Sequence, residues 1–478
     1  MGLLSSAPAQ VLTRLASRFE SFNRSVNGRI FAAALTVAAM TAVVKAASLL
    51  KDIVVAHHFG AGDALDAFYI ALLLPNFLTS AVGESFGASF IPVYIELRET
   101  DGREMAQRML SSLTCCGLAA FVGVSVLLAI FSGRLLPLIG SGFDPAKLGL
   151  ARVLLTPLLI WLGLCGINAL WHAALNAHER FGVSAISPIL TPLVIIAALA
   201  GFASRWGVYA VAVGSLVGGV ADLIFCGIAL RRAGISLLPR WYGLSPALLK
   251  VFGQFVPIVV GTLLMGSATV VDQTMAGMLS PGSVAALNYA NKLLTVSIWV
   301  GVHSLSVAVF PSLSQLSARE DWPGMRHVLR TYARLILLVS LPLTFVLVRY
   351  AEPLVALIFQ GGAFTAQDVR IVAHVQMLLC LQLPFFALGI LYVRALSALK
   401  HSQVLMWGTV INVVLNAVLN VLFMRMIGLP GIALSTSFVY LISCGFLWFM
   451  LERVLSRHEA RSADRVYERL PVLEASDG

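Results

Sequence analysis

The sequence carries little charge, and this excludes most soluble folds. Only 12% of its 478 residues are Asp, Glu, Lys or Arg, whereas 59% are hydrophobic. An average soluble domain has about 25% charged residues. Apolar runs long enough to cross a bilayer recur along the chain, and the short alternating segments typical of a membrane barrel are missing. The composition therefore predicts an all-α polytopic membrane protein.

Signatures of catalysis are also missing. The chain has no H-E-x-x-H, P-loop or G-x-S-x-G sequence, and the loops between apolar runs are too short for a catalytic domain. An intramembrane enzyme built on Glu84 or His172 remains an alternative, although a structural histidine is the simpler interpretation. The 6 cysteines form no C-x-x-C pair and are interpreted as packing residues. We expect a transporter without a cofactor.

The basic residues indicate how the chain is oriented. The formal net charge of +10 is not interpreted as nucleic-acid binding, because the basic residues cluster in loops between apolar runs. Twelve spans are predicted, and an even number places both termini on one side. That side would hold 23 of the 33 Lys and Arg residues and the opposite side 7, which predicts cytoplasmic termini. The predicted spans are 30–56, 64–95, 107–132, 149–175, 182–203, 206–230, 250–279, 283–316, 328–349, 368–394, 402–424 and 429–451.

The chain also repeats itself at an offset of 220 positions. At this offset Asp52 meets Asp272 and Tyr69 meets Tyr289, without a gap. Six spans per repeat is an even number, so the repeats would share topology and be related by a pseudo-twofold axis along the membrane normal. The predicted domains are an amphipathic N-terminal segment on the cytoplasmic membrane surface (1–29), two six-helix lobes (30–230 and 250–451), a cytoplasmic linker (231–249) and a polar cytoplasmic tail (452–478).

The candidate site consists of charged and polar residues inside apolar spans. A charge in the bilayer is costly unless it faces a partner or water, so such residues predict a functional cavity. Lysine can hold an anionic group such as a diphosphate as a point charge, although the same lysines could instead be neutralised by buried carboxylates. The predicted substrate-binding residues are Lys45, Lys51, Lys292, Asn76, Asn288 and Asn291. The predicted ion-pair and gating residues are Asp52, Glu84 and Asp272.

Several sequence stretches resemble one known family. They are KDIVVAHHFGAGDALDAFYIALLLPNFL, GESFGASFIPVY, VDQTMAGMLSPGSVAALNYANKL and IFQGGAFTAQD. In this order they resemble the MurJ (MviN) lipid II flippase family of the multidrug/oligosaccharidyl-lipid/polysaccharide (MOP) exporter superfamily. The resemblance implies alternating access between two lobes in the bacterial plasma membrane, with an undecaprenyl-diphosphate-linked saccharide as substrate. It also implies that Lys45, Lys51 and Lys292 occupy the places of cavity arginines, and that Asp52 and Glu84 match acidic residues of the family.

Two departures from the family pattern leave alternatives open. Thr79 and Ser80 stand where the family usually has arginine, and twelve spans are predicted where it usually has fourteen. The saccharide could be that of lipid II or an exopolysaccharide repeat unit. Rival functions are a cation-coupled drug exporter of the same fold and a membrane-embedded glycosyltransferase or polymerase. A coupling ion, H⁺ or Na⁺, and contacts with membrane lipids and cell-wall or polysaccharide assembly proteins also remain expectations.

Overall fold

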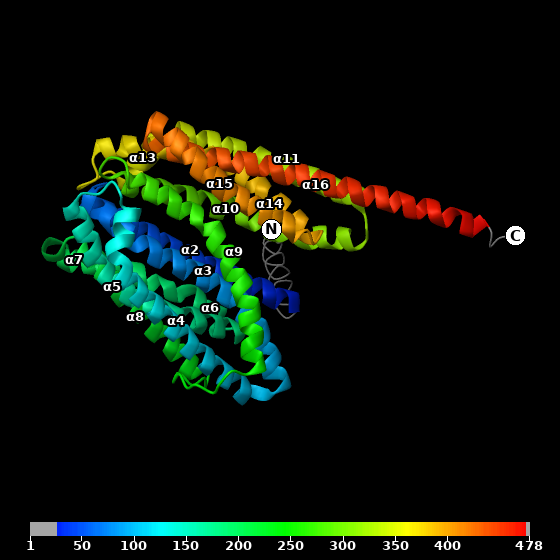
Figure 1. The fold of residues 1–478 in the computed structure, drawn as a ribbon, viewed down its shortest axis with the longest axis horizontal. Coiled ribbons are helices and arrows are strands. Elements are labelled where there is room, and N and C mark those ends of the chain that lie inside the picture. The colour runs from blue at the N-terminus through cyan, green and yellow to red at the C-terminus, as the bar shows by residue number, and fades with distance from the viewer. Residues whose placement is uncertain (1–25, 475–478) are drawn as a thin grey trace, which may run out of the picture.

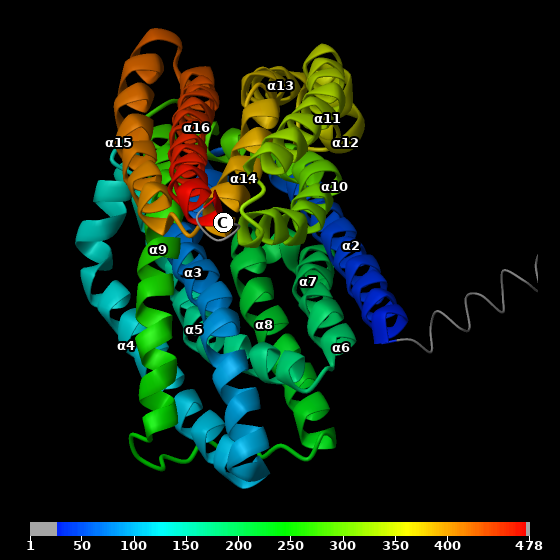
Figure 2. The ribbon, with the colours of Figure 1, turned by 90° about the vertical axis from the view of Figure 1, so that its right-hand side faces the viewer.

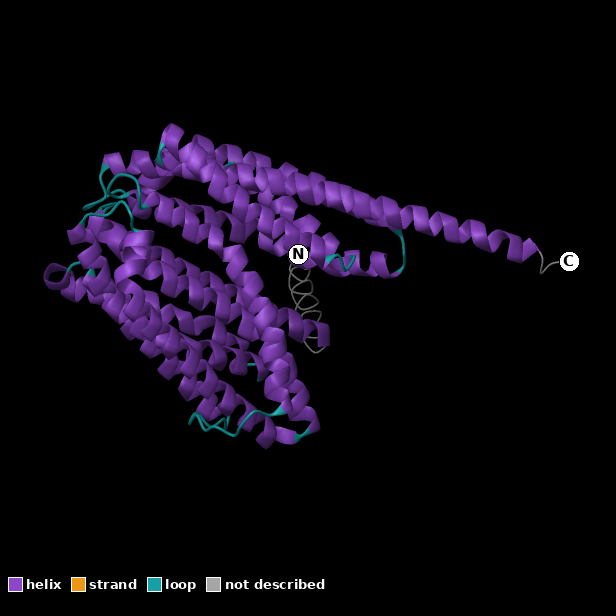
Figure 3. Ribbon diagram, in the orientation of Figure 1, coloured by secondary structure: helices purple, strands orange, loops and turns teal. Residues whose placement is uncertain are grey.

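A computed structural model describes residues 26–474, and it describes the side chains in this range except at 26–34, 84, 296–308 and 461–474. Over these residues the regular structure is helical, with a short bridge between Gly361 and Phe364 (Figure 3). The first half of the chain forms α2 (Val26–Phe59), α3 (Asp63–Thr100), α4 (Gly102–Ile139), α5 (Pro145–Ala177), α6 (Phe181–Ile186), η1 (Ser187–Ile189), α7 (Leu190–Trp206) and α8 (Tyr209–Arg232). The second half forms α9 (Pro246–Ala276), α10 (Ser283–Ala318), α11 (Trp322–Arg349), α12 (Ala351–Phe359), α13 (Ala366–Cys380), α14 (Leu383–Ala398), α15 (Ser402–Ile427) and α16 (Leu429–Glu474).

Each predicted span coincides with a helix or with a helix that is interrupted once. Among the described residues, 10 of these segments are long and apolar enough to cross a membrane. Helices α2 and α10, which include residues without described side chains, correspond to the other two of the twelve predicted spans. The prediction of an all-α multi-pass membrane protein is therefore confirmed.

Proline accounts for the two interrupted spans. The span predicted at 182–203 consists of α6, the 3₁₀ turn η1 and α7, and Pro188 lies within η1. Proline has no backbone N–H, and its ring clashes with the preceding helical turn. The span predicted at 368–394 divides into α13 and α14, and Pro384 lies in the first turn of α14. Both spans lie where they were predicted, and the structure adds the interruption within each.

The helix contacts of the first half recur in the second half. In the first half α3 packs on α4 and α5, α5 packs on α8, and α7 packs on both α8 and α2. In the second half α10 packs on α11, α13 and α14, α14 packs on α16, and α15 packs on both α16 and α9. The spans of the second half therefore contact one another in the same pattern as the equivalent spans of the first half. This pattern supports the internal repeat, while the domain boundaries at 231–249 stay a prediction.

The two halves contact each other in two ways. Their loops meet at one end, where α2 turns into α3 and α9 turns into α10, and α9 alone of the second half continues beside α3 toward the opposite end, while the ribbons of α10 to α16 diverge from the first half (Figures 1 and 2). The larger buried apolar core fills the first half and continues into α10, α12 and α13 near this joined end. Helix α9 runs along α3, where Phe255 stacks on Phe86 with ring centroids 4.5 Å apart.

The predicted C-terminal tail extends beyond the bundle. Helix α16 continues from its predicted span, 429–451, to Glu474, so most of the predicted tail is a helical extension that projects from the bundle (Figure 1). Of the predicted amphipathic segment 1–29, residues 1–25 lie outside the described residues.

Candidate functional site

Four loops meet where the two halves are joined. We call this contact the loop junction, and it is formed by residues 57–62, 140–144, 277–282 and 360–365. The backbone N–H of Ala363 donates to the carbonyl oxygen of His57 over 2.8 Å. Gly282 has a φ of +85°, and a Cβ at this position would collide with the carbonyl oxygen of Ala61. Glycine is needed here for the left-handed conformation and for the close approach of two backbones.

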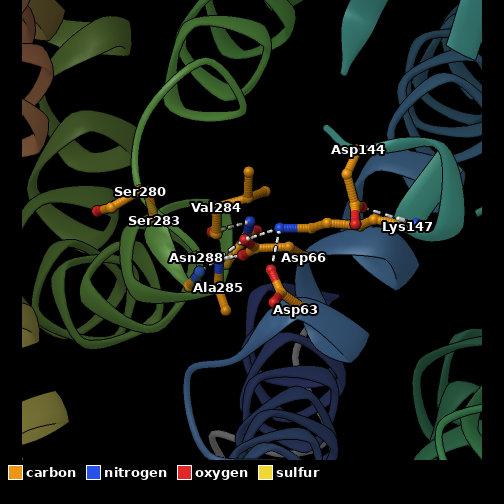
Figure 4. Close-up of polar contacts among 10 residues, drawn as sticks. Asp63, Asp66, Asp144, Lys147, Ser280, Ser283, Val284, Ala285 and Asn288 are labelled. Atoms are coloured by element: carbon orange, nitrogen blue, oxygen red, sulfur yellow. Dashed lines mark hydrogen bonds and ion pairs between the residues drawn. The ribbon is translucent and has the colours of Figure 1, made fainter. Parts of the chain in front are cut away.

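The carboxylate of Asp66 connects the halves at the loop junction (Figure 4). Asp66 lies in the first turn of α3 with 1% of its surface exposed. Its Oδ2 accepts from the backbone N–H of Gly282 over 2.7 Å, and its Oδ1 accepts from Ala285 over 2.8 Å. Both donors belong to the start of α10, whose N-cap residue is a glycine without a capping side chain. Asp66 therefore caps a helix of the other half, where an anion is favoured by the unpaired N–H groups and the helix dipole.

Lys147 provides the counter-charge for Asp66. Its Nζ lies 2.8 Å from Asp66 Oδ2 and 2.6 Å from Asp63 Oδ1 (Figure 4). It also stands over the ring of Phe143, 4.0 Å from the centroid. The Lys147 side chain is only 9% exposed, whereas that of Asp63 is 61% exposed. A buried carboxylate that is both ion-paired and hydrogen-bonded is costly to disrupt. The network fixes α3, α5 and α10 relative to one another.

The predicted lysines meet farther along α2 and α10. Lys51 Nζ lies 2.5 Å from Asp52 Oδ1, and Lys292 Nζ, from the other half, lies 3.4 Å from Asp52 Oδ2. We call these three residues the central charge cluster. Asp52 is 1% exposed, whereas the side chains of Lys51 and Lys292 are 20% and 41% exposed. One buried carboxylate thus holds two cationic groups that remain partly accessible.

The other predicted substrate residues lie near this cluster or on neighbouring helices. Lys45 is exposed on α2, seven positions before Asp52, and Asn291 is exposed beside Lys292. Asn288 accepts a hydrogen bond from Gln273 over 3.4 Å. Asn76 is exposed on α3. Their roles in substrate binding stay predictions.

Two predicted acidic residues have different surroundings. Asp272 does not join the lysines in this structure. Its Oδ1 accepts from Asn416 over 3.0 Å and from Asn420 over 2.6 Å, and its Oδ2 accepts from Thr436 over 3.4 Å. The carboxylate of Asp272 on α9 therefore connects Asn416 and Asn420 of α15 with Thr436 of α16. Glu84 lies on α3, but its side chain is outside the described part of the structure.

The end opposite the loop junction has an exposed ion pair between the halves and a partly buried contact within the first half. Lys250 at the start of α9 pairs with Glu96 of α3, with Nζ 2.6 Å from Oε2, and the two side chains are 48% and 57% exposed. The hydroxyl of Tyr94 lies 2.9 Å from Nε2 of His178. Burial, together with the positive charges of neighbouring arginines, lowers the pKa of His178.

Comparisons with known proteins agree with this architecture. The family model described as "Lipid II flippase MurJ" matches residues 55–474. The chain belongs to this family. A protein named "Probable lipid II flippase MurJ" from Vibrio cholerae is 26% identical over 89% of this chain and 84% of its own length. A relative of the same name from Thermotoga maritima is 27% identical over 84% of this chain and 80% of its own length.

Solved structures show the same fold. The structure titled "Lipid II flippase MurJ, inward closed conformation" has a TM-score of 0.77 at 22% identity and covers 92% of this chain and 93% of its own. An inward-facing multidrug resistance MATE family transporter of the MOP superfamily has a TM-score of 0.72 at 14% identity, over 88% of this chain and 99% of its own. Membership in the MurJ family confirms the predicted resemblance and the prediction of a transporter rather than an enzyme.

Sequence reasoning missed the loop junction. Neither Asp66 nor Lys147 is among the residues that the sequence analysis predicts for the site. The sequence offered two signals: an acidic residue in the first turn of α3, and a glycine instead of a capping side chain at the start of the equivalent helix α10. Their pairing is a long-range contact, 216 positions apart, that no local pattern indicates.

Proposed function

We propose that the chain flips lipid II, a polyprenyl-diphosphate-linked saccharide, across the bacterial plasma membrane by alternating access. The observation that carries this proposal is the central charge cluster, because it places two partly exposed lysines from opposite halves on one buried carboxylate. Family membership supports lipid II over an exopolysaccharide unit or a drug cation. A pair of cationic groups also suits a diphosphate better than a positively charged drug.

The arrangement of the loops supports an inward-facing state. All four segments of the loop junction belong to connections that the distribution of Lys and Arg places outside the cytoplasm. With cytoplasmic termini, the joined end faces outward and the diverging end faces the cytoplasm, where the lipid-linked precursor would enter. The orientation rests on the positive-inside rule and is part of the proposal.

The central charge cluster suggests how substrate binding drives the switch. Asp52 and an incoming diphosphate compete for the same two ammonium groups. When the diphosphate takes Lys292, the ion pair between α2 and α10 is replaced by a contact through substrate, and one of the connections that hold the present state is released. When the substrate leaves on the outer side, Asp52 recaptures Lys292 and resets the transporter. Exposed polar groups such as Asn76 and Asn291 would contact the saccharide.

The test is complementation of bacteria depleted of their own lipid II flippase. We expect the unaltered chain to restore growth, and Lys51→Ala and Lys292→Ala to fail at equal membrane abundance. Lys250→Ala is the matched control, because it removes an exposed lysine at the cytoplasmic end without touching the cluster. Failure of the unaltered, correctly inserted chain would reject lipid II as substrate and favour an exopolysaccharide unit. Growth with both cluster variants would reject the lysine mechanism.

A further inference from the structure

A second cluster of polar side chains lies inside the first half and plays no part in the proposed transport cycle. It consists of His172 on α5 with Asp222 and Cys226 on α8. Asp222 is 6% exposed and Cys226 is fully buried. The three residues offer a nitrogen, an oxygen and a sulfur atom within 4.8 Å of one another. No other such group of three occurs among the described residues.

The distances among the three side chains are compatible with a shared metal ion. His172 Nε2 lies 3.5 Å from Asp222 Oδ2 and 3.7 Å from Cys226 Sγ, and Cys226 Sγ lies 3.6 Å from Asp222 Oδ1. The contact between His172 and Asp222 is longer than the about 2.7–3.2 Å of a strong N–H···O bond, and the two sulfur contacts have the length of weak hydrogen bonds. By contrast, bonds of about 2.0–2.3 Å to a tetrahedral ion place adjacent ligand atoms about 3.3–3.6 Å apart. The imidazole nitrogen and the thiol sulfur each lie near one oxygen of the Asp222 carboxylate, at separations close to those between ligands of one tetrahedral ion.

The groups behind the three ligands are arranged as at protein metal sites. His172 Nδ1 lies 3.0 Å from the hydroxyl of Ser184, and the Asn168 amide donates to Asp222 Oδ2 over 2.7 Å. Metal-binding histidines and carboxylates are characteristically held by such hydrogen bonds, which fix the ring orientation. The hydroxyl of Ser187 lies 3.3 Å from Cys226 Sγ and 3.5 Å from His172 Nε2, on the open side of the three ligands. It marks the position of a fourth ligand, either itself or a water.

We propose that His172, Asp222 and Cys226 bind a divalent transition-metal ion of the zinc class. Imidazole and thiolate ligands favour Zn²⁺ or Co²⁺ over Mg²⁺, Ca²⁺ or Na⁺. Binding replaces the thiol S–H bond with a sulfur–metal bond and releases the proton to solvent. The ion would join α5 and α8 beside η1, where Pro188 interrupts the span. This departs from the expectation of no cofactor and from the interpretation of Cys226 as a packing residue.

The test is the metal content and cobalt spectrum of the purified full-length chain. After incubation with ZnSO₄ and desalting, mass spectrometry should find about one zinc per chain. Asp222→Asn and Cys226→Ala should lose this zinc, whereas Cys380→Ala should keep it, because Cys380 is equally buried but lies outside the cluster. With Co²⁺, a thiolate-to-metal absorption band should appear in the unaltered chain and in Cys380→Ala but not in Cys226→Ala.

A folding control keeps the outcome decisive. Ser184→Ala should preserve the gel-filtration profile while lowering zinc affinity about 10–100-fold, since it removes only the hydrogen bond behind the histidine. Zinc should also raise the thermal-unfolding midpoint of the unaltered chain and leave that of Cys226→Ala unchanged. An unaltered chain that keeps no stoichiometric zinc and gives no cobalt band would overturn the proposal. So would Asp222→Asn and Cys226→Ala variants that retain zinc at the level of the unaltered chain.

Discussion

The loop junction and the central charge cluster both connect the two halves through one buried carboxylate, but they differ in what that carboxylate holds. Asp66 binds two backbone N–H groups of α10 and a lysine that is 9% exposed. Asp52 binds only lysine side chains, and that of Lys292 is 41% exposed. Backbone donors within a helix turn cannot move independently of the helix, whereas lysine side chains can change partner. The loop junction is therefore suited to stabilise one arrangement of the halves, whereas the lysines of the central charge cluster are suited to exchange Asp52 for a substrate anion.

The largest effect is expected from Asp66→Ala. This change leaves Lys147 and two helix N–H groups without their buried acceptor, and breaking a buried pair in this way costs about 3–5 kcal/mol. We expect a marked fall in the thermal-unfolding midpoint in detergent and loss of complementation. Asp63→Ala is the control, because Asp63 contacts the same lysine but is 61% exposed. Equal effects of the two changes would show that the cap on α10 contributes nothing.

A second prediction concerns the close backbone approach at the junction. Gly282→Ala and Gly243→Ala place a side chain at nearly the same φ, +85° and +87°, so both incur similar backbone strain. Only Gly282→Ala collides with a neighbour, the carbonyl of Ala61. We expect an additional loss of about 1–3 kcal/mol for Gly282→Ala, measured by thermal unfolding of both variants. Indistinguishable midpoints would mean that the two loops are not in contact.

A third prediction separates binding from transport at the central charge cluster. Asp52→Asn removes the carboxylate that competes with substrate for Lys51 and Lys292. A diphosphate-bearing lipid should therefore bind the purified chain more tightly, with a Kd lower by up to about tenfold, which corresponds to about 1.4 kcal/mol. Transport should nevertheless fall, because the variant cannot recapture Lys292. Binding is measured by titration with a fluorescent diphosphate lipid, with Lys292→Ala expected to weaken it. Weaker binding to Asp52→Asn would contradict the competition.

The smallest effect is expected at the opposite end. Glu96 and Lys250 form an exposed pair, and such pairs contribute about 0–1 kcal/mol. The free energies of unfolding of Glu96→Ala, Lys250→Ala and the double variant should differ from that of the unaltered chain by no more than this amount. All three variants should restore growth of bacteria depleted of their own lipid II flippase. A double-mutant cycle with a large coupling energy, or loss of transport in either single variant, would show that this exposed pair contributes to the connection between the halves.

Patterns along the chain predicted the spans because apolar length is a local property. The same patterns predicted Lys51, Asp52 and Lys292 as site residues, since charges inside apolar helices stand out. They could not predict that Asp52 and Asp272, equivalent in the repeat, would take lysine partners in one case and amide partners in the other. That choice depends on residues such as Asn416 and Asn420, which lie far along the chain. The cap that Asp66 provides for α10 depends on tertiary packing in the same way.

The most direct test of the account is lipid II translocation in proteoliposomes containing the purified chain. The unaltered chain and Lys250→Ala should move fluorescent lipid II between leaflets, while Lys292→Ala and Asp66→Ala, inserted to the same level, should not. That result would show that this chain translocates lipid II and that translocation requires both the central charge cluster and the loop junction. Translocation by Lys292→Ala at the rate of the unaltered chain, or none by the unaltered chain, would contradict the account.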